Sequence, residues 1–75
     1  MEWMEWVEMA AAARVAQRRR GDGAAVPGIS GASIWRYERG NCSRLEQLEL
    51  WARGLGLDVA VAEEAWRTRY ERESP

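Results

Sequence analysis

Hydrogen-bonding and basic side chains gather in one short segment of the chain, between Gly28 and Gly40. Gly28 allows a sharp turn, and Ser30 is a residue type that caps a following helix. Ile34 and Tyr37, three residues apart, give that helix one inward face. Small, polar and basic residues remain for its other surfaces: Gly31, Ala32, Ser33, Trp35, Arg36 and Arg39. These side chains can form hydrogen bonds, because a guanidinium can donate to both acceptors of guanine and a serine hydroxyl can reach a base or a phosphate.

Residues for catalysis or metal binding are scarce. The chain contains no histidine and a single cysteine, Cys42, so a zinc site would have to rest on carboxylates and one thiol. We find no nucleophile with a partner base, no cluster of metal ligands and no phosphate-binding loop. The sequence therefore predicts a protein that is not an enzyme and that needs no metal, no cofactor and no small-molecule ligand.

Length and cysteine content point to one small domain over residues 1–75. A chain of this size buries only about 60% of the surface that its unfolded form exposes, so we expect a homodimer. Cys42 has no second cysteine to pair with, which fits a reducing compartment. No apolar run approaches the roughly 20 residues of a membrane span, and Glu2 and Glu5 stand where a secretory signal would be basic. We expect a soluble, cytoplasmic protein without a membrane partner.

The net charge of −1 conceals an uneven distribution. Residues 1–13 carry −3, residues 14–44 carry +5 and residues 45–75 carry −3, so the positive charge coincides with the segment described above. All 11 basic residues are arginine, which suits bidentate contact with phosphate or guanine. A GC-rich genome explains the same bias, and both explanations stay open.

The first half of the chain predicts one long helix and one uncertain segment. Residues 2–19 lack Gly and Pro, begin acidic and end basic, and place Trp3, Val7, Ala10 and Ala11 on one apolar face that serves the core or a dimer contact. Trp6 and Met9 fall partly outside that face. Between Gly21 and Pro27, either Asp22 caps a single helical turn or the segment is a loop.

The second half predicts another helix over 43–55 and an open choice over 58–72. Ser43 followed by Glu46 is a capping box, and apolar residues recur at helical spacing after it: Leu45, Leu48, Trp51, Ala52 and Leu55. Gly54 or Gly56 ends this helix. Beyond it, Asp58 can cap a final helix, or residues 57–61 can alternate as a strand that pairs with a second copy, and the alanines and Glu–Arg spacing favour the helix.

From Gly28 to Gly56 the chain resembles the Cro and lambda-repressor (XRE) type of helix-turn-helix regulators. The resemblance consists of the turn Gly28-Ile29-Ser30, the closing element Glu38-Arg39-Gly40, and two later segments, Ser43–Leu48 and Trp51–Gly56. It covers about 29 of the 75 residues. The chain departs from the family in one segment. The family has a longer second helix that carries a leucine at the position of Gly23, and that helix normally supports the recognition helix.

The resemblance implies an all-α, lambda-repressor-like bundle of four to five helices, with 22–40 as the helix-turn-helix and 31–39 as the recognition helix. It implies a repressor, similar to those of phages, that binds double-stranded operator DNA as a dimer and is associated with the nucleoid. The implied base contacts are Ser30, Gly31, Ala32, Ser33, Trp35, Arg36 and Arg39. The implied phosphate contacts are Arg19, Arg20, Asn41, Ser43 and Arg44. The resemblance also implies a structural ion pair between Arg14 and Glu38.

Two alternatives remain at this stage. Trp35 can cover the DNA backbone, insert beside a base or pack on the second helix, and packing is the preferred choice. The whole chain can instead be a helical adaptor or antitoxin-like partner whose five tryptophans form a protein interface.

Overall fold

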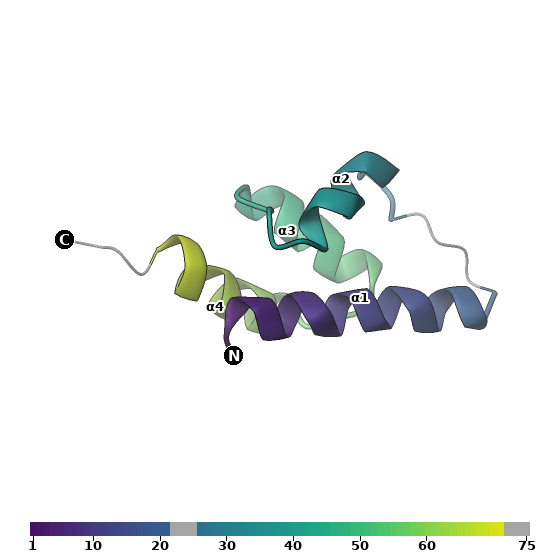
Figure 1. Ribbon diagram of the computed structural model, residues 1–75, viewed down its shortest axis with the longest axis horizontal. Helices are drawn as coiled ribbons and strands as arrows, with labels where there is room; N and C mark the ends of the chain where they lie inside the picture. The colour runs from purple at the N-terminus through teal and green to yellow at the C-terminus, as the bar shows by residue number, and fades with distance from the viewer. Residues whose placement is uncertain (22–25, 72–75) are drawn as a thin grey trace.

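The computed structural model describes residues 1–21 and 26–71 and shows an all-helical domain (Figure 1). Those residues form four helices and no strand: α1 (Trp3–Arg19), α2 (Gly31–Tyr37), α3 (Leu45–Gly54) and α4 (Val59–Tyr70). The predicted all-α class is confirmed. The strand alternative for 57–61 is wrong, because Asp58 caps α4 by accepting a hydrogen bond from the Ala60 N–H at 2.9 Å. None of these helices is long and apolar enough to cross a membrane.

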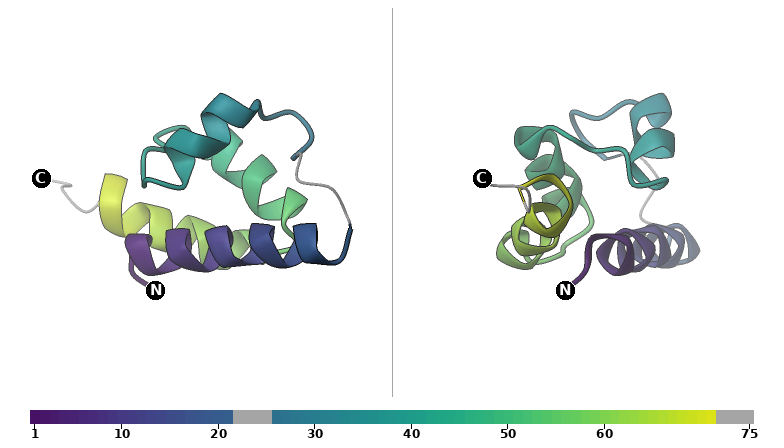
Figure 2. Two further views of the ribbon diagram at one scale, coloured as in Figure 1. Left: turned by 45° about the vertical axis from the view of Figure 1, so that its right-hand side comes forward. Right: turned by 60° about the vertical axis from the view of Figure 1, so that its left-hand side comes forward.

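Helix α1 is the longest helix and lies alongside α4 (Figure 2). It begins at a capping box in which Glu2 accepts from the backbone of Met4 and Glu5, and the Glu5 carboxylate accepts from the Glu2 N–H. Its buried residues are Trp3, Trp6, Val7 and Ala10. Trp6, which the sequence places partly outside the first apolar stripe, is completely buried, so the buried face of α1 is broader than that stripe.

Aromatic rings from all four helices meet in the core. Trp6 of α1 lies edge-on to Trp51 of α3, with ring centroids 4.9 Å apart, and Tyr37 of α2 packs against the same indole at 5.5 Å. Trp66 of α4 is also buried. A core fixed by large rings leaves few alternative packings for the short helix α2, whose Ile34 and Tyr37 form its buried face.

The loop after α2 is fastened to the start of α1 and to the end of α4, which lie at the same end of the bundle. Gly40 adopts φ 93°, a conformation that favours glycine, and its carbonyl oxygen accepts from Trp3 Nε1 and from the Tyr70 hydroxyl, both at 3.0 Å. Two residues later, the carbonyl of Cys42 accepts from Trp66 Nε1 at 2.9 Å, and the Cys42 side chain is fully buried. Helices α1 and α4 therefore fix where α2 ends.

The same anchoring explains why the predicted capping box at Ser43 is wrong. The N-cap of α3 is Arg44, with φ −100° and ψ 119°, and no side chain caps the helix. Because Cys42 is held in the core and its thiol donates to the Arg44 carbonyl at 3.8 Å, the chain stays extended past Ser43. Helix α3 then ends at Gly54 with Leu55 as its C-cap, and Gly56 just beyond takes φ 72° so that the Leu57 N–H bonds back to the Ala52 carbonyl.

The predicted turn of helix over 22–26 falls almost entirely outside the described residues. Val26 itself is buried and packs on α3, where a Cβ at Gly54 would lie only 2.5 Å from Val26 Cγ1. The Ile29 N–H then bonds to the Val26 carbonyl at 3.1 Å, and Gly28 takes φ 84°. This tight turn leads directly into the Ser30 cap of α2.

Candidate nucleic-acid interface

Helix α2 has one buried face and one exposed face. The Ser30 hydroxyl accepts from the Ser33 N–H at 3.2 Å, so the helix begins at Gly31 as the sequence predicts. Its outer surface is formed by residues that are all exposed: Gly31, Ala32, Trp35 and Arg36. These residues line a shallow hollow of about 540 Å³. The absence of large side chains at the front of the helix creates that hollow and leaves its backbone approachable.

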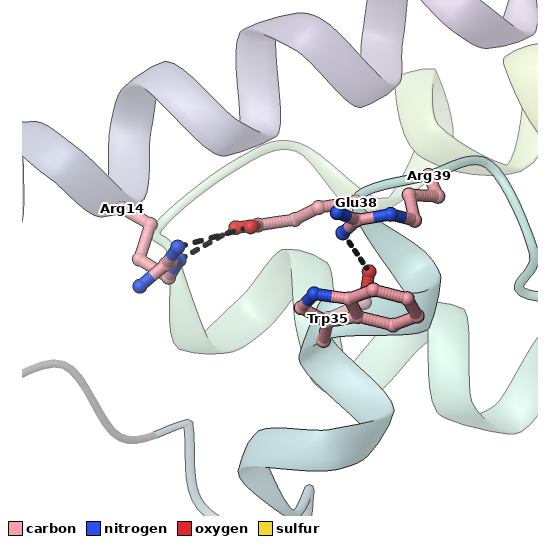
Figure 3. Close-up of polar contacts among 4 residues, drawn as sticks. All are labelled: Arg14, Trp35, Glu38 and Arg39. Carbon is pink, nitrogen blue, oxygen red and sulfur yellow. Dashed lines mark hydrogen bonds and ion pairs between the residues drawn. The ribbon is translucent and has the colours of Figure 1, made fainter.

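Trp35 stands out from the helix, 58% exposed, with the Arg39 guanidinium stacked 3.6 Å from the ring centroid (Figure 3). Arg39 also donates from Nη1 to the Trp35 carbonyl at 3.2 Å. Most of the ring remains in solvent. The preferred interpretation, in which Trp35 packs on the second helix, concerns a segment that lies almost entirely outside the described residues. A flat ring carrying a cation suits contact with the sugar-phosphate backbone or with a base.

A chain of hydrogen bonds runs along the front of α2. The Ser30 hydroxyl donates to the Ser33 hydroxyl at 3.1 Å, and Ser33 accepts from Arg36 Nη2 at 3.3 Å. All three side chains are within reach of solvent. The bond to Ser33 directs the guanidinium toward the N-terminal end of α2, over the small residues, where a ligand can approach it.

Arg14 and Glu38 form the ion pair that the resemblance implies, and it joins the middle of α1 to the end of α2 (Figure 3). Arg14 donates from Nε to Oε2 at 2.5 Å and from Nη2 to Oε1 at 3.0 Å. The hydrogen bonds that Arg14 donates to Glu38 raise the pKa of Arg14 against the effect of partial burial. The two side chains are only 23% and 14% exposed, so the pair is largely shielded from water and ties α2 to α1.

The five residues implied as phosphate contacts are all on the surface, in two separate groups. Arg19 and Arg20 lie at the C-terminal end of α1, whereas Asn41, Ser43 and Arg44 lie on the loop between α2 and α3. The structure does not bring the groups together. In both Figure 1 and the left view of Figure 2, one group lies toward the start of α2 and the other beyond its end.

Sequence reasoning missed two contacts of this surface, the Trp35–Arg39 stack and the Ser33–Arg36 hydrogen bond. Both join residues three or four positions apart on one helix, and that spacing is the signal that would have found them. No protein-family model, curated protein or solved structure matches this chain. Function must therefore be inferred from the geometry and chemistry of the chain's own residues.

Proposed function

We propose that the protein is a sequence-specific double-stranded DNA-binding regulator, a repressor similar to the Cro type, that places α2 in the major groove of its operator. The observation that carries this proposal is the exposed front of α2, where the small residues Gly31 and Ala32 lie in one hollow with Trp35 and Arg36. The major groove is about 12 Å wide and accepts a single helix that can come close to base edges.

Arg36 reads sequence in this proposal. Its guanidinium is exposed and is held over the small residues by Ser33, so it can donate two hydrogen bonds to guanine. Such a bidentate contact discriminates between bases by about 1–3 kcal/mol. Ala32 meets a thymine methyl group, and Ser30, Ser33, Trp35 and Arg39 complete the contact surface.

The backbone contacts lie on either side of α2. Arg19 and Arg20 meet phosphates beyond its start, while Asn41, Ser43 and Arg44 meet them beyond its end. Helix α3 begins at Arg44 without a side-chain cap, so its first N–H groups face no competing side chain when a phosphate approaches. These contacts position the protein and carry no sequence information.

The structure gives little support to the adaptor alternative. That alternative requires the tryptophans to form a protein interface, but Trp3, Trp6, Trp51 and Trp66 are at most 8% exposed and belong to the core. Only Trp35 is available to a partner, and it lies on the arginine-bearing helix.

Footprinting on the DNA upstream of the protein's own gene, followed by titration of the protected fragment against salt, tests the proposal. A DNA-binding protein loses affinity steeply as salt rises, with a slope set by its phosphate contacts. Arg36→Ala should flatten the preference among operator variants, whereas Arg44→Ala should weaken binding to all of them alike and reduce the salt slope by about one. Protection of no fragment at low salt would refute DNA binding, and equal effects of the two substitutions would refute the assigned roles.

A further inference from the structure

A second stripe of α1, beside its core-facing side, is covered by no other helix of the described residues, although Met4 at one end lies near the loop at Gly40. The stripe consists of Met4, Glu8, Ala11 and Val15, of which Met4 is 41% and Val15 is 44% exposed. Their spacing of four, three and four residues keeps them on one line along the helix. Ala11 and Ala12 lie near its centre, where a second helix could approach closely, whereas Ala10 is buried in the core.

The stripe lies on the flank of α1. Gln17 of α1 bonds to the Gly54 carbonyl of α3, and Arg14 faces α2. Because successive residues turn by 100°, Val15 lies beyond Arg14 on the side away from Gln17. In the right view of Figure 2, α4 lies on one side of α1 and α2 lies above it, so no helix formed by the described residues covers the flank opposite α4.

The charges of α1 indicate what covers this flank. The N-terminal half carries Glu5 and Glu8, and the C-terminal end carries Arg18 and Arg19, all of them exposed. A helix that is acidic in its first half and basic in its second is complementary to itself when a second copy runs antiparallel. With the twofold axis between Ala11 and Ala12, Glu5 lies opposite Arg18 of the second copy.

We propose that two copies of this chain pair through the α1 flank, antiparallel, with the alanines at the crossing point and the acidic half of each helix beside the basic half of the other. An isologous contact of this kind closes on itself and gives a dimer. A helix of 17 residues is only about 25 Å long, so the contact is small and dimerisation depends on concentration. Pairing is independent of DNA binding, although it leaves both α2 helices on one side of the dimer, which the proposed function requires.

Sedimentation without DNA, over a range of protein concentrations, tests this pairing. The parent chain should sediment as a monomer when dilute and as a dimer when concentrated. Val15→Glu should abolish the dimer, because it places a second carboxylate opposite Glu8 of the other copy. Ala60→Glu, at an exposed position on α4, is the matched control and should leave the dimer unchanged.

Charge exchange provides the decisive comparison. One variant carries Glu5→Arg and Glu8→Arg, and the other carries Arg18→Glu and Arg19→Glu. Each alone should be monomeric, because like charges then face each other, whereas an equimolar mixture should form a heterodimer. Mixing cannot cure a folding defect in either chain, so this rescue reports on complementarity alone.

Three outcomes would overturn the pairing: a parent chain that stays monomeric at every concentration, a dimer that survives Val15→Glu, or charge-exchanged chains that do not associate on mixing. None of them bears on whether a monomer contacts DNA. Conversely, if footprinting detects no DNA site, a dimer that shows the charge-exchange rescue still supports the pairing.

Discussion

The ion pair between Arg14 and Glu38 should stabilise the fold measurably, because it is the charged link between α1 and the end of α2. Hydrogen bonds to charged groups contribute about 1.5–3 kcal/mol, and exposed ion pairs contribute less than about 1 kcal/mol. With the side chains 23% and 14% exposed, water still reaches the pair, so we expect an intermediate coupling of about 1–2 kcal/mol. For a domain of this size, that loss lowers Tm by about 4–16 °C.

A double-mutant cycle measures this coupling. Arg14→Met, Glu38→Gln and the double variant are unfolded in urea and followed by circular dichroism, and the coupling is the difference between the double variant and the sum of the single ones. Arg67 and Glu71 provide a matched control, since they form an ion pair at 3.3 Å one helical turn apart with both side chains more than half exposed. Their coupling should be about 0.3–0.5 kcal/mol.

The operator affinity links this measurement to function. If the pair holds α2 in place, Glu38→Gln should weaken binding even though Glu38 is not among the proposed DNA contacts. A coupling no larger than that of the control pair would refute the bracing role. Full operator affinity in a measurably destabilised Glu38→Gln variant would separate stability from the presentation of α2.

Two further predictions concern the loop after α2. Gly40→Ala should lower the free energy of unfolding more than Gly21→Ala. Both glycines have positive φ, so an alanine at either position incurs strain of about 1–3 kcal/mol, but of these two positions only Gly40 would bring the new Cβ close to another residue, at 2.8 Å from Met4 Sδ. Equal losses in urea unfolding would contradict this reasoning. Burial raises the pKa of the Cys42 thiol to about 11. Iodoacetamide at pH 8 should therefore not modify the folded protein but should modify it fully in denaturant, as measured by mass spectrometry. Rapid labelling of the folded chain would contradict the burial.

Features set by neighbouring residues could be predicted from the sequence. Ser30 caps α2 because its hydroxyl needs only an N–H three residues away, and Gly56 ends α3 because a positive φ is a local requirement. The helical choice after Asp58 was correct for the same reason. In each case the deciding interaction lies within a few residues of sequence.

Features set by distant contacts could not be predicted. Ser43 and Glu46 have the spacing of a capping box, but Trp66 holds the Cys42 carbonyl and keeps the chain extended beyond the expected cap. Trp6 joins the core because Trp51, 45 positions later in the sequence, offers its ring. The same distinction applies to the candidate interface. Helical spacing predicts that Arg36 lies on an outer face, whereas the exposure of Trp35 could be seen only in the structure.

The carbonyl of Gly40 accepts from Trp3 near the start of α1 and from Tyr70 at the end of α4. Fraying of either terminal helix therefore releases the same acceptor and loosens the loop that ends α2. Trp3 and Tyr70 pack against each other, with ring centroids 5.9 Å apart, so opening of this end of the domain is coupled to the arginine-bearing helix. The amide hydrogens of this region should therefore exchange with solvent as one cooperative unit, with no terminal segment that unfolds separately.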